Sequence, residues 1–234
     1  MRAAILVVLL AILAACGRPL TPNETAYLQA LNGDTLDTGR MRLIDGHLAG
    51  SLSYTIPVRP RTTCQERIWP PVLQERRVEV SPAATVIFNA VMLRRDIYRT
   101  DLMAGFPEQI DLFQAMLLAH EAVHVWQWQN RDRTAYHPLR GLGEHAGGRD
   151  PYLFDTDALP RFLDFGYEQQ GAIVEEYVCC SLLDPEAPRT ARLRALIGQE
   201  IPVEGLDAVL SGPQVRLPWD GARTQGICRP GHKG

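Results

Sequence analysis

Apolar residues recur at steps of three and four through the middle of the chain, which is the spacing of one face of an α-helix. Five positions share this face: Phe113, Met116, Leu117, His120 and His124. Pro107 and Glu108 suit the first turn of such a helix. The pattern therefore predicts one long amphipathic helix over about residues 107–130, with both histidines on its apolar side.

Strand-like segments precede this helix, and helical segments follow it. The expected strands cover residues 41–44, 51–58, 78–80, 85–93 and 97–98, with a turn at 45–46. The other expected helices cover residues 22–31, 159–183 and 190–197. Thr21, Pro22 and Glu24 form a start signal for the first, and Gly166 marks a break in the second. Residues 131–158 are expected to be irregular, and the glycine-rich stretch 141–148 within them is predicted to form a flexible active-site rim. The expected class is α+β, with a small twisted sheet packed on the long helix and a helical C-terminal part.

The long helix carries the motif His-Glu-x-x-His at His120, Glu121 and His124. Imidazoles four residues apart lie one turn apart, so both can point at one metal ion. Glu121 lies about 100° around the helix, where it can reach a water on that metal. The motif predicts a zinc hydrolase with Glu121 as general base. The alternative is two packed histidines without a metal, which is disfavoured because burying neighbouring imidazoles without partners is costly.

A catalytic zinc site needs a third protein ligand and an open position. In the metzincin group a glycine and a histidine follow the second histidine at fixed spacing, but Gln127 and Asn130 stand there. A later helix offers Glu168 and Glu175 instead, on a stripe with small residues. These two lie seven residues and about 10 Å apart along the helix, so only one can be a ligand. The other could accept a hydrogen bond from a ligand histidine. The alternative is a solvated acidic face.

These motifs resemble those of bacterial zincin-like metallopeptidases of the gluzincin type. The resemblance rests on residues 120–127, His-Glu-x-x-His-Val-Trp-Gln, and on Glu-Gln-Gln at 168–170 with an acid farther along, and it covers about residues 78–180. Gly171 departs from the pattern, which usually has Ala there. The resemblance implies a zincin-like fold and hydrolysis of a peptide bond in a protein or peptide substrate by metal-activated water. The implied Zn²⁺ ligands are His120, His124 and Glu168, with Glu175 as second choice.

The reaction would also need a hydrogen-bond donor for the developing oxyanion. The candidates are Tyr136, His137, His145, Tyr152 and Tyr167, with Tyr152 preferred. Two other classes of function stay open: an envelope binding or assembly protein that holds zinc without catalysis, and a hydrolase of cell-wall amides. The intact Glu121 argues against the first. Trp126 and Trp128 could stack on glycans in the second, although their positions favour the core.

The N-terminus has the pattern of a lipoprotein signal peptide. Arg2 precedes an apolar run at 3–12, which is short for a membrane span, and residues 13–16 resemble a bacterial lipobox that ends at Cys16. The resemblance implies cleavage after residue 15 and lipidation of Cys16, with a simple signal peptide as the alternative. Gly17 in place of Asp favours the periplasmic face of the outer membrane over the inner membrane. Residues 16–22 would then form a tether, and 23–234 a single domain with its core at about 78–183.

Composition adds two constraints. The chain is 46 % hydrophobic with a net charge of −3 and has no basic run, which gives no indication of a nucleic-acid partner; nothing indicates an oligomeric state. The remaining cysteines are Cys64, Cys179, Cys180 and Cys228. An even number in an exported chain favours disulfides, and adjacent Cys179 and Cys180 would bridge each other only with strain, so two longer links to Cys64 and Cys228 are expected. The alternative is a second zinc site with Cys228 and His232.

Overall fold

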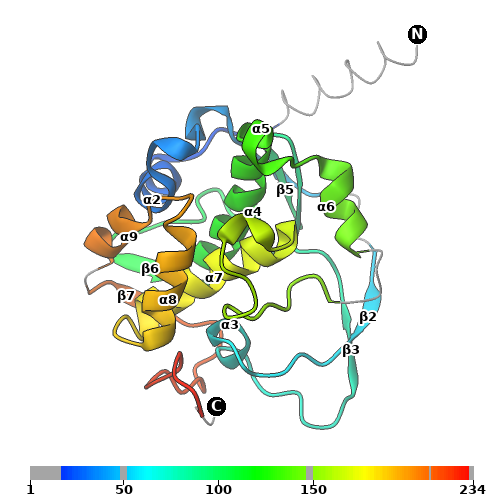
Figure 1. Cartoon of the computed structure of the whole chain (residues 1–234), viewed down its shortest axis with the longest axis vertical. Helices are drawn as coiled ribbons and strands as arrows, with labels where there is room; N and C mark the ends of the chain where they lie inside the picture. Colours follow the sequence, from blue (N-terminus) through cyan, green and yellow to red (C-terminus); the bar gives the residue numbers. More distant parts are fainter. Residues whose placement is uncertain (1–16, 48–51, 146–149, 211, 232–234) are drawn as a thin grey trace.

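The computed structural model describes residues 17–47, 52–145, 150–210 and 212–231 (Figure 1). The expected signal peptide, the lipidation site Cys16 and His232 lie outside the described residues. The described part has the predicted α+β character, with short strands and helices in the order shown in Figure 1. Within that part, none of the helices combines the length and the apolar character that a membrane crossing would require.

Among the residues that the structure describes, three small sheets form in place of the one predicted. The first has the order β1-β5-β4, in which β1 (Arg42–Asp45) runs parallel to β5 (Ala90–Leu93), and β5 runs antiparallel to β4 (Ala84–Ile87). The second pairs β2 (Tyr54–Pro57) with β3 (Arg77–Val80) antiparallel. The third pairs β6 (Gln109–Asp111) with β7 (Gln214–Arg216) in parallel. The first sheet packs on the long helix α4 through β4, as the pattern predicted for a single sheet.

Two strand predictions and one turn prediction were wrong. The predicted strand at 85–93 is a hairpin, because Phe88 adopts a positive φ of 58° and turns the chain between β4 and β5. The predicted turn at 45–46 does not join β1 to β2, since β1 pairs with β5 instead. Residues 97–98 form a turn in which the Ile97 amide donates to the Arg94 carbonyl, not a strand.

The long helix α4 (Leu112–Gln129) begins later than the predicted residue 107. Asp111 caps it by accepting a hydrogen bond from the Gln114 amide at 3.1 Å, a common arrangement at helix starts. The residues just before the helix belong to β6, whose partner strand β7 lies about a hundred residues downstream. A local pattern contains no information about that partner, which is why the predicted start was too early.

The N-terminal helix α2 (Pro22–Asn32) begins as predicted, because Thr21 and Glu24 exchange hydrogen bonds in a capping box. Glu24 is fully buried and also binds both terminal nitrogens of Arg18 at 2.7 Å. Arg18 in addition forms a β-bridge with Leu43. The segment just after Gly17 is therefore packed on the fold.

Helix α7 (Tyr167–Leu183) packs along α4, and the two lie side by side in the middle of Figure 1. It begins eight residues after the predicted start at 159. The break predicted at Gly166 is its N-cap, and a 3₁₀ turn, η5 (Phe162–Asp164), precedes it.

The region at 131–158, which was predicted to be irregular, contains two short helices. The remaining helices are α3 (Cys64–Arg67), α5 (Arg131–Thr134), α6 (Pro138–Glu144), α8 (Pro188–Ile197) and α9 (Glu204–Val209), with 3₁₀ turns η1 (Gly33–Thr35) and η2 (Thr38–Arg40).

The hydrophobic core extends beyond the predicted limits of 78–183. It also includes Leu28 and Leu31 from α2 and Leu193 and Ile197 from α8, all of them buried. Trp126 is fully buried against the ring of Phe162. Trp128 is half-buried, and its ring lies between Phe88 and the guanidinium of Arg131. Both tryptophans therefore pack within the fold, as their positions favoured.

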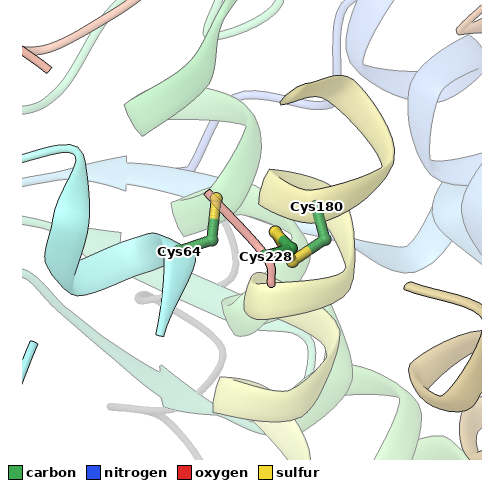
Figure 2. A group of neighbouring side chains, drawn as sticks. All are labelled: Cys64, Cys180 and Cys228. Atoms are coloured by element: carbon green, nitrogen blue, oxygen red, sulfur yellow. A yellow bond between two sulfur atoms is a disulfide. The ribbon is translucent and has the colours of Figure 1, made fainter. Parts of the chain in front are cut away.

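Two disulfides join α7 to distant parts of the chain, as the cysteine count predicted. Cys64 on α3 bonds to Cys179, and Cys180 bonds to Cys228. Figure 2 shows Cys64 beside the Cys180–Cys228 bond, which links α7 to the C-terminal segment. Cys64, Cys180 and Cys228 lie close enough together for a metal site. Their sulfurs are already bonded, however, so the alternative of a second zinc site at Cys228 was wrong.

Candidate metal centre

Two helices bring three potential metal ligands together. His120 and His124 project from α4, and Glu168 projects from the first turn of α7. Oε2 of Glu168 lies 3.4 Å from Nε2 of His120 and 3.3 Å from Nε2 of His124. All three residues are buried, with 5 %, 5 % and 8 % of their surface exposed in that order. The residues that the sequence singled out as ligands therefore converge on one point.

Gly171 allows this close approach of α7 to α4. It lies one turn after Glu168, and a Cβ at this position would stand 2.7 Å from Nε2 of His120. Such a distance is well inside van der Waals contact, so the ring of His120 occupies space that any other side chain would need. Gly171, which departs from the family-like pattern, therefore sets how near the histidine can come to α7.

Glu175 contacts the other side of the His120 ring. Its Oε2 lies 3.2 Å from Nδ1 of His120, while Glu168 faces Nε2. A carboxylate at Nδ1 fixes the proton there and leaves the Nε2 lone pair free for a ligand. The sequence left open which glutamate is the third ligand and which accepts a hydrogen bond from a ligand histidine. The geometry favours Glu168 as the ligand and Glu175 as the acceptor.

Two buried glutamines, Gln127 and Gln170, orient the imidazole of His124 in a similar way. Gln127 donates from its amide nitrogen to the Tyr167 carbonyl at 3.1 Å and to Oε1 of Gln170 at 3.0 Å. Gln170 in turn donates to the Phe165 carbonyl at 2.8 Å. These acceptors orient both amides, so Oε1 of Gln127 faces Nδ1 of His124 at 2.9 Å, where it can accept a hydrogen bond from a protonated Nδ1. In its neutral form, His124 with a proton on Nδ1 has its lone pair on Nε2, the nitrogen that faces Glu168.

The three groups also shift one another's ionisation. Burial disfavours the charged form of His120, but its bonds with Glu168 and Glu175 outweigh burial and raise its pKa well above the usual range. The pKa of His124 is raised as well, since attraction to Glu168 outweighs burial. Burial opposes ionisation of Glu168, yet the nearby histidines hold its pKa well below the usual range. The carboxylate of Glu168 is thus kept ionised and available to a cation.

Glu121 lies next to the ligand pair and is 7 % exposed. Burial raises its pKa, and the neighbouring carboxylates Glu168 and Glu175 raise it further, while the two histidines lower it. A carboxylate with a raised pKa is a stronger base than one in water. Its environment therefore favours uptake of a proton more than that of a carboxylate in water.

The site as a whole fits a divalent cation. Glu121, Glu168 and Glu175 place three carboxylates around two imidazoles, and among the described residues no arginine forms an ion pair with any of them. Glu121 and Glu168 are buried and Glu175 is partly exposed, and three carboxylates exceed the charge that two imidazoles can balance, so a further cation would be favourable. Tetrahedral nitrogen and oxygen ligands about 2.1 Å from zinc lie about 3.4 Å apart, close to the two distances from Oε2 of Glu168. The negative charge of the site and the distances between its ligand atoms are both those expected for a divalent cation such as Zn²⁺.

The five predicted oxyanion donors separate into two groups. Tyr152, Tyr136 and His145 lie at the site: the ring centroid of Tyr152 is 5.7 Å from those of His120 and His145, and Tyr136 stacks on His124 at 6.2 Å. Burial raises the pKa of the Tyr152 hydroxyl, which therefore keeps its proton. His137 instead caps α6, and Tyr167 donates its hydroxyl to the Thr134 and Ala135 carbonyls.

The sequence motifs did not identify the residues that support the site. Arg59 holds the Tyr152 segment, because it binds both oxygens of Asp150 and its guanidinium lies 4.8 Å from the Tyr152 ring centroid. Gln127 and Gln170 orient His124, as described above. The only signal for these two was their place beside the ligands in the motif; nothing in the sequence pointed to Arg59, which lies 61 residues before His120.

Comparison with known proteins adds little to this geometry. No protein-family model matches the sequence, and no curated protein matches it. Among solved structures, the effector domain of Pseudomonas aeruginosa VgrG2b is similar at 19 % sequence identity, with 80 % of this chain and 85 % of that chain covered and a TM-score of 0.49. A similarity of this degree carries no argument about function, which rests on the site itself.

Proposed function

We propose that this protein is a zinc-dependent peptidase of the gluzincin type with a zincin-like fold. His120, His124 and Glu168 would hold the Zn²⁺ ion. The observation that carries the proposal is the pair of distances from Oε2 of Glu168 to the two histidine Nε2 atoms, 3.4 and 3.3 Å, in a buried site with Glu121 beside it. A purely structural zinc site has no need of that extra carboxylate, which favours an enzyme over a binding or assembly protein.

Bound zinc would act as a Lewis acid and lower the pKa of a coordinated water to about 7. Glu121 accepts the proton of the attacking water and delivers it to the leaving amine, a role that its raised pKa supports. Tyr152 donates its hydroxyl proton in a hydrogen bond to the carbonyl oxygen of the scissile amide. Glu175 and Gln127 keep the two ligand imidazoles in the tautomer with a free Nε2.

The proposed location is the periplasmic face of the outer membrane, with the chain anchored by a lipid on Cys16. Support comes from the lipobox-like residues 13–16 and from Gly17. The test is fractionation of cells that express wild type or Cys16→Ser: the variant should move from the membrane to the soluble fraction. An unchanged distribution would contradict lipidation without affecting the metal site.

The metal and the reaction are tested together by metal analysis and a casein assay. Glu121→Gln should keep full zinc occupancy and lose activity by about 10²- to 10⁴-fold, because the base is gone and the ligands remain. Glu168→Ala should lose most of its zinc. Glu186→Ala, at an exposed acid, is the control and should change neither quantity. Full zinc in Glu168→Ala would refute the ligand set, and an active Glu121→Gln would refute the base.

The substrate class is tested with the same proteins. Casein and short peptides are compared with soluble cell-wall fragments that contain an amide between sugar and peptide. Cleavage of protein and peptide substrates that disappears in Glu121→Gln supports the peptidase. Cleavage confined to the wall fragments would favour a cell-wall amidase, and zinc binding without turnover of any substrate would favour a binding or assembly role.

A further inference from the structure

The end of helix α6 lies directly against the first turn of α7. The carboxylate of Glu144 accepts hydrogen bonds from the backbone amides of Tyr167 at 2.8 Å and Glu168 at 3.0 Å. The next residue, His145, places Nε2 3.1 Å from Oε1 of Glu168. Two consecutive residues from a different segment therefore bind both the main chain and the side chain of the proposed third ligand.

Helix α7 needs this external partner because its own cap position is Gly166, which has no side-chain acceptor. The first amides of any helix lack partners within the helix, and an anion at that end is favourable. Helices α2 and α4 solve the problem locally with Thr21 and Asp111. Gly166 also leaves room for Glu144, since a Cβ there would lie 3.1 Å from Oε1 of that carboxylate.

The two contacts act on different parts of Glu168. Glu144 holds the backbone from which the side chain projects, and His145 contacts Oε1, the oxygen that does not face the ligand histidines. Oε2 is left directed at His120 and His124. The carboxylate is therefore constrained at its root and at one of its oxygens, which determines where the other oxygen lies.

We propose that Glu144 and His145 are positioning residues that place Glu168 for metal binding. The inference rests on the proposed metal site and adds to it that zinc affinity depends on a segment that holds no ligand. A helix cap without this function would affect only the stability of the fold. A positioning pair also determines how tightly the metal is held, because supporting contacts of a ligand typically change metal affinity by about 10- to 100-fold.

The test measures the zinc dissociation constant by competition with a chelator, together with the thermal midpoint of unfolding. Glu144→Ala and His145→Ala should each weaken zinc binding by about 10- to 100-fold. Glu144→Gln keeps one carbonyl acceptor and should fall between Glu144→Ala and wild type. The control is Asp111→Ala, which removes the cap of α4 nine residues before His120. It should lower the Tm by about 2–4 °C and leave zinc affinity within about threefold of wild type.

Each outcome has one meaning. Wild-type zinc affinity in both Glu144→Ala and His145→Ala would overturn the inference, as would an equal loss of affinity in Asp111→Ala. If Glu144→Ala does not fold, Glu144→Gln and His145→Ala decide the question by the same titration. Undiminished zinc binding in Glu168→Ala would instead remove the ligand set itself, and this inference with it.

Discussion

The two halves of helix α7 are both buried against neighbouring elements but are held by different forces. The N-terminal half carries Glu168, Gly171 and Glu175, which face the histidines of α4 through hydrogen bonds and charge. The C-terminal half carries Cys179 and Cys180, which are bonded covalently to α3 and to the C-terminal segment. The C-terminal half is held by covalent bonds whatever the charge state of its surroundings. The contacts of the N-terminal half depend on the protonation of the histidines and glutamates between α7 and α4.

A comparison of Glu176 with Glu168 shows what this difference means for buried charge. Glu176 is fully buried, but it accepts hydrogen bonds from the backbone amides of Cys64 and Gln65 and from Arg189 at 2.6 Å. Its negative charge therefore has a cationic partner within the protein. Glu168 has only histidines as side-chain partners among the described residues. The charge of Glu176 is balanced by Arg189, whereas Glu168 has no arginine partner among the described residues and is available to a metal.

Removal of a disulfide should have the largest effect, and it should act on stability alone. The Cys180–Cys228 bond closes a loop with a sequence separation of 48, so its loss in Cys180→Ser with Cys228→Ser should lower the free energy of unfolding by about 2–5 kcal/mol. The measurement is denaturant unfolding of zinc-loaded protein, alongside a zinc titration under native conditions. Loss of zinc affinity by more than tenfold in folded protein would show that the two halves of α7 are not independent.

Removal of the Glu175 carboxylate should affect metal binding by the N-terminal half of α7. Glu175→Ala removes the acceptor at Nδ1 of His120 and should weaken zinc binding by about 10- to 100-fold, with a much smaller change in stability than the disulfide variant shows. Glu175→Gln keeps a carbonyl acceptor and should recover part of the affinity. A chelator titration measures both. Equal affinities in wild type and Glu175→Ala would show that the contact does not orient the imidazole.

A single methyl group at Gly171 should have the smallest effect on stability. Alanine gains about 1 kcal/mol of helix propensity, but its Cβ would meet His120 at 2.7 Å and cost about 1–3 kcal/mol of strain. The net destabilisation of Gly171→Ala should therefore be about 1 kcal/mol, with weaker zinc binding because the His120 ring must move. Gly143→Ala in α6 is the matched control, since its Cβ would meet nothing within 4 Å. Unchanged zinc affinity in Gly171→Ala would show that the helices separate without displacing the ring.

Local patterns were sufficient for several features of the site. The spacing of His120 and His124 within an apolar stripe placed both on the inner face of α4, where the structure has them. The seven-residue spacing of Glu168 and Glu175 predicted that they share a face but have different roles, and they contact opposite nitrogens of His120. Helical and capping patterns involve neighbours within a turn or two, so they are visible in the sequence.

Several of the features that were predicted wrongly or missed depend on partners far away in the chain. The start of α4 follows the pairing of β6 with β7, and β1 pairs with the distant strand β5. The support of Glu168 by Glu144, and of Tyr152 by Arg59, joins segments that no local spacing relates. Such contacts arise only after the chain has folded.

The sequence by itself determined the α+β class, the ligand-bearing face of the long helix, the start of α2 and the need for two long disulfides. These follow from helical periodicity, from local hydrogen bonding and from the geometry of sulfur bonds. Only the tertiary structure decided that Glu168 and not Glu175 faces both histidine Nε2 atoms, and that Glu144, Gln127 and Gln170 support them. The reason is that the distance and rotation between α4 and α7 result from packing of the whole core, and periodicity along one helix does not specify them.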